Sequence, residues 1–267
     1  MPQLSDRSRF AGCGYFRYGK GPLIVLLHGF GEDSRIWQYQ VEVLQHHYTV
    51  VVPDLPGSGQ SPLPQQPLHI ERMADMVKEI LDQEDCQQTI LLGHSMGGYI
   101  TLAFAEKYPE YLQGFGLIHS TAYADDEAKK ETRRKAIRLI RNEGKTAFLR
   151  AMIPNLYGEK AKQNNPSDIE AHFRMALETS EESLIAAYEA MILRPDRTTV
   201  LRNAKVPVLF VIGERDNAVP PLHSFEQCSL PNISSVSFLS DCGHTGMFEV
   251  RNRMNTILHS FCEFIFG

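Results

Sequence analysis

Continuous apolar runs alternate along much of the chain with segments in which apolar residues recur every three or four positions. Residues 23–27, 48–52 and 89–92 are apolar, aromatic or β-branched throughout, as expected of strands covered on both faces of a sheet. Residues 69–84 instead place their apolar side chains at helical spacing. Strands that alternate with helices imply right-handed crossovers. The pattern therefore predicts an α/β fold with a doubly wound, mostly parallel sheet.

The same reading gives a complete set of core elements. Strands are predicted over residues 14–18, 22–27, 48–52, 89–93, 112–118, 206–212 and 234–239. Helices are predicted over residues 34–45, 69–84, 96–107 and 251–266. Ligands of such sheets bind at the carboxyl ends of the strands. The turns at His28, Asp54, Ser95 and His119 are all expected at that edge.

The middle of the chain has a different character, because no strand-like run occurs between residues 121 and 196. Its charged sequence predicts helices over residues 125–141, 145–152, 167–179 and 181–193, separated by glycine, asparagine and proline. The apolar stripes of these helices need a surface to pack on. We expect residues 1–120 and 197–267 to form the core, with residues 121–196 as an inserted all-helical cap over the strand ends.

Composition and charge exclude several classes of protein. Of the 267 residues, 43% are hydrophobic and 22% charged, and the net charge is −5. These values are ordinary for a globular domain and give no basic field for nucleic acid or an anionic membrane. Residues 1–10 lack an apolar signal segment, and no later run reaches the length of a membrane span. We expect a cytoplasmic protein whose five scattered cysteines are reduced thiols.

The strand at residues 89–93 leads into the sequence Gly93-His94-Ser95-Met96-Gly97. Gly-x-Ser-x-Gly is typical of a nucleophile elbow, a strained turn that holds a serine hydroxyl at a helix N-terminus. The same spacing also occurs by chance in a loop that precedes an ordinary helix. Ser95 is therefore a candidate nucleophile that needs partners elsewhere in the chain.

A serine hydroxyl attacks an acyl carbon only when a base removes its proton and an acid orients that base. Asp216 follows a buried-type strand and is the candidate acid, with Glu214 as the nearest competitor and Asp196 a more remote one. His244 follows the last predicted strand in a loop of small residues and is the candidate base. The order serine, aspartate, histidine is the one expected in this kind of sheet.

The intermediate formed on a serine also needs hydrogen-bond donors for its oxyanion. The amide of Met96, directly after Ser95, is one candidate, and the amide of Phe30 in the turn Gly29-Phe30-Gly31 is the other. The His28 ring is expected to brace that turn. Cys242 is not expected to act as a nucleophile, and no metal signature or cofactor motif is found, so neither is predicted.

Together, His28-Gly29-Phe30-Gly31, the elbow, Gly213-x-x-Asp216 and Gly243-His244 resemble the α/β-hydrolase superfamily over nearly the whole chain. Within it, the chain is similar to small cap-bearing carboxylesterases, carbon–carbon bond hydrolases, enol-lactonases and perhydrolases. Serine at position 95 argues against dehalogenases and epoxide hydrolases, which have aspartate there. Menaquinone-pathway members carry an arginine where this chain has Tyr99, which weakens a carboxylate-handling function.

The resemblance implies hydrolysis of a small, largely apolar acyl substrate, most simply a carboxylic ester, through an acyl-enzyme on Ser95. Trp37, Phe148, Met152 and Met191 are candidates for the pocket wall, although apolar residues at helical spacing are as readily core. A carbon–carbon bond hydrolase, a lactonase and an aminopeptidase would use the same triad. A small-ligand receptor with slow or no turnover is the alternative of another class.

Overall fold

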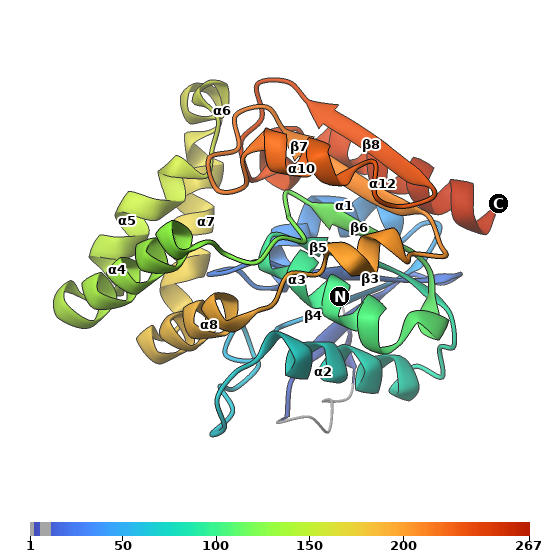
Figure 1. Cartoon of the computed structure of the whole chain (residues 1–267), viewed down its shortest axis with the longest axis horizontal. Helices are drawn as coiled ribbons and strands as arrows, with labels where there is room; N and C mark the ends of the chain where they lie inside the picture. Colours follow the sequence, from blue (N-terminus) through green and yellow to red (C-terminus); the bar gives the residue numbers. More distant parts are fainter. Residues whose placement is uncertain (1–2, 6–11) are drawn as a thin grey trace.

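A central sheet with helices packed on both sides organises the molecule (Figure 1). The computed structural model describes residues 3–5 and 12–267 of the chain. Most of the segment 1–10, for which the sequence predicts no signal peptide, thus lies outside the described residues. Helix α1 (Gln38–Leu44) packs on α12 (Arg251–Phe266), and α2 (Ile70–Gln83) packs on α3 (Met96–Lys107).

The described residues form an eight-stranded sheet in the order β1-β2-β4-β3-β5-β6-β7-β8. Its strands are β1 (Gln3–Ser5), β2 (Tyr15–Tyr18), β3 (Leu23–Leu27), β4 (Thr49–Pro53), β5 (Thr89–His94), β6 (Leu112–Ile118), β7 (Val208–Gly213) and β8 (Ser234–Leu239). Pairing is antiparallel between β1 and β2 and between β2 and β4, and parallel in every other pair. The predicted doubly wound, mostly parallel sheet is confirmed.

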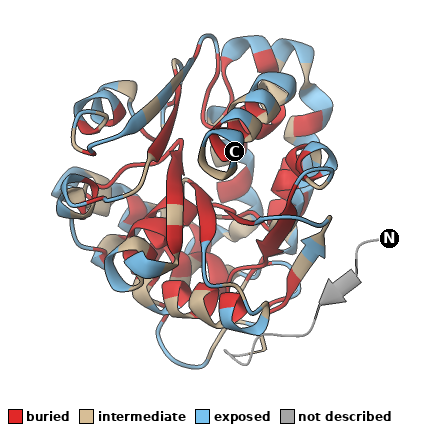
Figure 2. Cartoon of the chain, turned by 90° about the vertical axis from the view of Figure 1, so that its right-hand side faces the viewer, coloured by how far each residue is buried: buried red, intermediate tan, exposed pale blue. Residues whose placement is uncertain are grey.

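Burial of the strands explains why they read as continuous apolar runs. Every residue of β3, β4, β5 and β7 is buried, and the strands in the middle of the molecule stand out as buried in Figure 2. Edge strand β8 instead alternates exposed and half-buried residues as far as its buried last residue, Leu239, because successive side chains point to opposite faces of the sheet. The carboxyl ends of β5, β6 and β7 meet at one edge of this buried layer.

Between β6 and β7 the chain forms a group of helices that we call the inserted helices: α4 (Glu127–Glu143), α5 (Lys145–Asn155), α6 (Glu159–Asn164), α7 (Pro166–Glu178) and α8 (Glu181–Leu193). Helix α4 packs on α5 and α8, and α5 packs on α7. Figure 1 shows the group at one side of the molecule, beside the loops that leave the strands. The division into a core and a cap domain remains a prediction.

Several short helices were not predicted from the sequence. They are α6, α9 (Thr198–Arg202), α10 (Pro221–Gln227) and α11 (Gly246–Glu249), and none of them is long enough to show a helical repeat of apolar residues. The helix expected over residues 34–45 begins as a 3₁₀ turn, η1 (Ser34–Trp37), and a second such turn, η2 (Pro109–Tyr111), precedes β6. Within the described residues, no helix combines the length and the apolar character needed to cross a membrane.

Candidate active site

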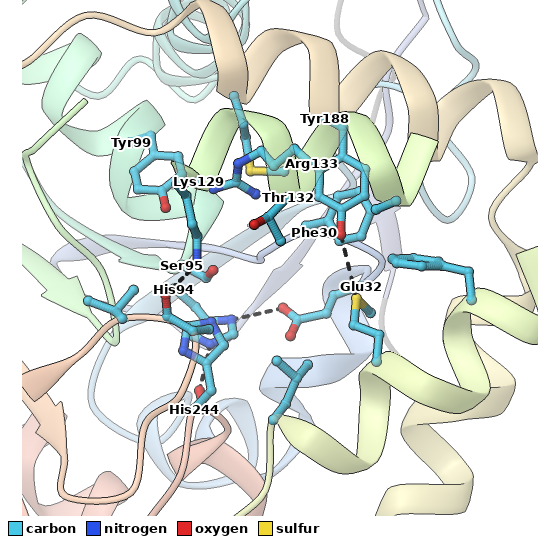
Figure 3. A pocket seen from close by; sticks show the side chains of 17 residues that line it. Phe30, Glu32, His94, Ser95, Tyr99, Lys129, Thr132, Arg133, Tyr188 and His244 are labelled. Atoms are coloured by element: carbon cyan, nitrogen blue, oxygen red, sulfur yellow. Dashed lines mark hydrogen bonds and ion pairs between the residues drawn. The ribbon is translucent and has the colours of Figure 1, made fainter. Parts of the chain in front are cut away.

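A cavity of about 270 Å³ lies between the sheet edge and the inserted helices. Ser95 and His244 line it from the core, and Phe148, Met152 and Met191 line it from the inserted helices. Figure 3 shows the side chains that converge there from both parts of the molecule. The structure thus brings the candidate nucleophile and the candidate base to one cavity.

Ser95 sits on a strained turn between β5 and α3. Its backbone angles are φ 51° and ψ −113°, a conformation that L-residues rarely adopt and that tends to occur at functional sites. A Cβ atom at Gly93 would lie 2.3 Å from the backbone of Gly97, and one at Gly97 would lie 2.5 Å from the Leu27 carbonyl oxygen. Both glycines of the motif are therefore needed to pack the turn against α3 and β3.

His244 and Asp216 are paired by a hydrogen bond of 2.8 Å between Nδ1 and Oδ2. The other carboxylate oxygen, Oδ1, accepts bonds from the amides of Ala218 and Val219, each at 2.8 Å. Burial would raise the pKa of Asp216, but the charge of His244 and the hydrogen bonds of its neighbours hold that pKa well below the usual range. Because Nδ1 donates to the carboxylate, Nε2 is the nitrogen left to accept a proton.

The loop that carries His244 is fixed by another carboxylate. Glu249 accepts hydrogen bonds from the amides of Gly243 and Thr245 on either side of the histidine, and also from Gly158. The His244 amide donates to the Leu156 carbonyl at 2.6 Å. The backbone position of the candidate base is therefore set jointly by α11 and by the segment between α5 and α6.

Glu32 and His94 form a second buried pair next to the first. His94 Nδ1 lies 2.9 Å from Glu32 Oε2, and its Nε2 lies 2.9 Å from the His244 carbonyl oxygen. Both partners are acceptors only, so both ring nitrogens donate and the ring is an imidazolium. Burial alone would oppose both charges, but their mutual attraction raises the pKa of His94 and lowers that of Glu32 to about 2.

The Glu32 carboxylate also braces the turn Gly29-Phe30-Gly31, which we call the oxyanion turn. Glu32 Oε2 accepts a bond from the Gly29 amide at 2.7 Å, and among the described residues no acceptor is paired with the Phe30 amide. The His28 ring donates through Nδ1 to the Gly29 carbonyl and accepts at Nε2 from the Leu55 amide, so it braces the turn as expected. Met96 is the first residue of α3, where backbone amides lack helical partners.

Two further histidines are completely buried beside these pairs. His119 follows β6, and its Nδ1 lies 3.4 Å from Asp216 Oδ2, while neither of its nitrogens forms a hydrogen bond within the described structure. His172 of α7 bonds Tyr157 through Nδ1 and faces Glu32 Oε1 through Nε2 at 3.7 Å. Burial lowers the pKa of both rings, that of His172 to about 4. His119 was expected at the sheet edge, and no function was predicted for it from the sequence.

A metal ion could use one group of side chains near the cavity. Ligand atoms of His119, Asp216 and His244 all lie within 4.8 Å of one another. A metal there would take the oxygen that orients His244, so it would compete with the hydrogen bond between the two side chains. Cys242 is buried, and burial raises the pKa of its thiol, which keeps it protonated and a poor nucleophile.

The predicted pocket wall is only partly found. Phe148, Met152 and Met191 line the cavity, whereas Trp37 does not. The Trp37 ring is completely buried and packs edge-on against His94, with ring centroids 6.4 Å apart. Its prediction as a pocket residue was wrong because η1 turns this side chain into the core beneath the turn that carries Ser95.

Two aromatic and two cationic residues of the cavity were missed from the sequence. Tyr188 stacks on Phe30 with centroids 4.1 Å apart, and Tyr99 lines the opposite wall. Lys129 and Arg133 of α4 also line the cavity. A signal for them was present, because they lie eight and four residues before Ile137, whose side chain belongs to the buried stripe of α4.

Comparison with known proteins agrees with the fold described above. The family described as alpha/beta hydrolase fold matches residues 22–198. A thermophilic esterase from Thermogutta terrifontis, solved with malate bound, has a TM-score of 0.93 and 30% sequence identity, and the match covers 100% of both chains. The pimeloyl-[acyl-carrier protein] methyl ester esterase of Pseudoalteromonas atlantica is 27% identical over 237 residues, which are 85% of this chain and 88% of that protein.

A more local similarity is found to an uncharacterized protein of Mycobacterium bovis. It is 32% identical over 108 residues, which cover 40% of this chain and 32% of that relative. The chain therefore spans only a minor part of the length of this relative. The fold, the family match and the esterase-like relatives support the same conclusion. This chain belongs to the alpha/beta hydrolase fold family.

Proposed function

We propose that this hydrolase cleaves small carboxylic esters through an acyl-enzyme on Ser95. One observation carries the proposal. His244 is held by Asp216 through Nδ1 at 2.8 Å, which leaves Nε2 to accept a proton in the cavity that Ser95 also lines. The esterases among the relatives act on the same class of bond by their names.

The proposed first half of the reaction forms the acyl-enzyme. Ser95 Oγ attacks the ester carbonyl carbon while His244 Nε2 takes the hydroxyl proton. The amides of Phe30 and Met96 would stabilise the negative oxygen of the tetrahedral intermediate. The bond to the alcohol oxygen then breaks, and His244 returns the proton to that oxygen, so that a neutral alcohol leaves.

The proposed second half reverses the roles with water as the nucleophile. His244 takes a proton from water as the water oxygen attacks the acyl carbon. The bond to Ser95 Oγ breaks, Oγ recovers a proton from His244, and the carboxylic acid is released. Asp216 holds the imidazole in the required tautomer throughout and stabilises the imidazolium that forms twice.

We assign the inserted helices to a cap that closes the cavity. Phe148, Met152 and Met191 come from α5 and α8 and supply an apolar wall opposite Ser95. A volume of about 270 Å³ suits a small acyl group. Arg251 of α12 forms an ion pair with Asp168 of α7, which is one of the contacts that would hold the cap on the core.

A fluorophosphonate probe tests the nucleophile, because it phosphonylates an activated serine. The intact protein should gain one adduct that maps to Ser95, and hydrolysis of p-nitrophenyl acetate and butyrate should stop as the adduct forms. Ser95→Ala should lose both properties. The control Ser229→Ala changes an exposed serine that lies outside the inserted helices, and it should keep both. An adduct elsewhere, or full ester hydrolysis by Ser95→Ala, would contradict the proposal.

A further inference from the structure

Two cations on one face of α4 line the cavity that the candidate nucleophile, Ser95, also lines. Lys129 and Arg133 are four residues apart in α4, so they lie one above the other on the same side. Both line the cavity with Ser95, and Figure 3 shows the Arg133 guanidinium between the rings of Tyr99 and Tyr188. The cavity that would receive the substrate therefore has a positively charged wall on the cap side.

The charge of this wall is only partly neutralised. Arg133 donates to Asp125 through Nε at 2.6 Å and more weakly through Nη2 at 3.4 Å. The same carboxylate also pairs with Arg194 at 2.9 Å. All three residues are less than 10% exposed. Two guanidinium groups thus share one carboxylate, which leaves an excess positive charge in a buried place.

Arg133 also retains hydrogen-bonding capacity. Its Nε and Nη2 are used by Asp125, and within the described structure no acceptor is paired with its Nη1. Lys129 donates one hydrogen bond, to the Ala218 carbonyl at 3.0 Å, of the three that an ammonium group can form. Both cations can therefore accept a further anionic partner without losing the protein contacts that position them.

The remaining acid of the cavity cannot supply that partner. Glu32 is the carboxylate among the residues that line the cavity, and its oxygens are engaged by the Gly29 amide, by His94 and, more distantly, by His172. Its charge is balanced by the His94 imidazolium. A bound molecule with its own negative charge is therefore the partner that the cavity lacks.

The positions of the cations fit a substrate that reaches from the nucleophile to the cap. The Arg133 guanidinium lies 5.6 Å from the centre of the Tyr188 ring, and that ring stacks on the ring of Phe30, whose amide is the candidate oxyanion donor. Lys129 contacts Ala218, two residues after Asp216. One aromatic ring thus separates the oxyanion turn from Arg133, and one short loop separates Asp216 from Lys129.

We propose that the ester cleaved by this enzyme carries a carboxylate, which binds Arg133 and Lys129 while Ser95 attacks the ester carbonyl. This inference rests on the proposed function and narrows its substrate class. It also replaces two expectations from the sequence, a largely apolar substrate and a weakened carboxylate-handling function at Tyr99. The cations come from α4 of the cap, so a tyrosine at position 99 does not remove the capacity to bind a carboxylate.

The carboxylate could belong to the acyl part or to the alcohol part of the ester. A second cavity of about 470 Å³ adjoins the first, and Tyr99, Lys129, Thr132, Ala218 and Val219 line both. Lys129 is thus accessible from either side. Two pairs of substrates separate the sources: monomethyl glutarate with methyl pentanoate for the acyl part, and 4-acetoxybutanoate with butyl acetate for the alcohol part.

Proton release measured with a pH indicator gives kcat/KM for each ester. We expect the charged member of at least one pair to exceed its neutral partner by about 10- to 100-fold, the range for a charge-assisted hydrogen bond. The pair that shows the preference identifies the part of the substrate that carries the carboxylate. Equal values, or a preference for the neutral member, in both pairs would overturn the proposal.

Matched variants test the two cations. Arg133→Met and Lys129→Met should each lower kcat/KM for the charged ester far more than for its neutral partner, and so remove most of the preference for the charged ester. The controls Arg134→Met and Lys130→Met remove cations of the same helix that do not line the cavity, and they should keep the preference. If Arg133→Met does not fold, Lys129→Met and Arg133→Lys still report on the site.

Failure of this inference can be told apart from failure of the proposed function. If Ser95 is labelled by a fluorophosphonate and neutral esters are cleaved without any preference for charged ones, only the carboxylate site is wrong. If no ester is cleaved and Ser95 is not labelled, the proposed function itself is wrong. If Lys129→Met loses the same activity on charged and neutral esters, Lys129 has only a structural role, and its role in substrate binding is overturned.

Discussion

Two buried pairs of a histidine and a carboxylate lie side by side in this molecule, and only one of them is suited to move protons. His244 with Asp216 and His94 with Glu32 have nearly the same Nδ1 to oxygen distance, 2.8 Å and 2.9 Å. The two imidazole rings are 4.9 Å apart, centre to centre. Distance to the acid therefore does not distinguish them.

The difference lies at the other nitrogen of each ring. His94 Nε2 donates to the His244 carbonyl at 2.9 Å, so its second proton is held in place. Both rings line the cavity, but among the described residues no partner is bonded to His244 Nε2, which can therefore take a proton and give it back. A carboxylate partner therefore does not by itself make a histidine a base, because an unoccupied nitrogen at the reacting centre is also required.

Loss of the acid beside His244 should have the largest effect. Asp216→Asn keeps the shape but no longer holds the Nδ1–H tautomer or stabilises the imidazolium, and kcat for ester hydrolysis should fall by about 10⁴-fold. Steady-state kinetics on a neutral ester measures it, with Glu214→Gln as the control at the competing acid. A loss confined to Glu214→Gln would transfer the role of the acid to that residue.

Loss of the acid beside His94 should have a smaller and different effect. Glu32→Gln retains an oxygen to accept from the Gly29 amide but removes the charge that stabilises the His94 imidazolium. We expect kcat to fall by about 10- to 100-fold through the oxyanion turn, with KM little changed. A fall as large as that in Asp216→Asn would show that both pairs take part in proton transfer and would break the distinction between them.

His172 should make stability depend on pH without affecting proton transfer. It faces Glu32 and lies near His94, His244 and Asp33, and its pKa in the folded protein is lowered to about 4. The unfolded chain then binds a proton that the folded chain does not, so stability is lost as the pH falls from about 6.5 to 4. This ring should account for about 1 kcal/mol of unfolding free energy per pH unit.

Chemical denaturation of the native protein and of His172→Phe at pH 4.5, 5.5 and 6.5 isolates this contribution. The variant should show a shallower decline towards low pH, whatever its stability at pH 6.5. An unchanged slope would mean that the ring is protonated in the folded protein and paired with Glu32.

Among the buried histidines near Ser95, His119 should contribute least to catalysis. Its nearest approach to Asp216 is 3.4 Å, and its backbone has a φ of 49°. Asparagine tolerates this conformation, so His119→Asn should fold and change kcat/KM by less than about tenfold, because Asp216 keeps its two amide donors and His244. A loss comparable to that of Asp216→Asn would make His119 part of the catalytic group.

Much of this site could be predicted from the sequence because its parts follow strands. The ends of β5, β7 and β8 locate Ser95, Asp216 and His244, and the glycines on either side of Ser95 are explained by backbone packing. The fold class follows from the same strands. Continuous apolar runs are read reliably when both faces of the sheet are covered.

The rest depends on contacts that no local pattern contains. Glu32 in a turn reads as a surface carboxylate until the fold places His94 and His172 against it. Lys129 and Arg133 share the helix face of the buried Ile137, but that spacing alone does not show that the face lines a cavity. Trp37 was misplaced for the converse reason, since an apolar side chain at helical spacing fits a core and a pocket equally well.

The protonation states of His94 and His244 test the central distinction most directly. In the protein labelled with ¹⁵N-histidine, the nitrogen shifts should show both His94 nitrogens carrying a proton, as its two acceptor partners require, and the neutral His244 ring in the tautomer with the proton on Nδ1. Spectra of His94→Asn and His244→Gln assign the two rings. A bare nitrogen on His94, or a neutral His244 ring with its proton on Nε2, would contradict the assignment of His244 as the base.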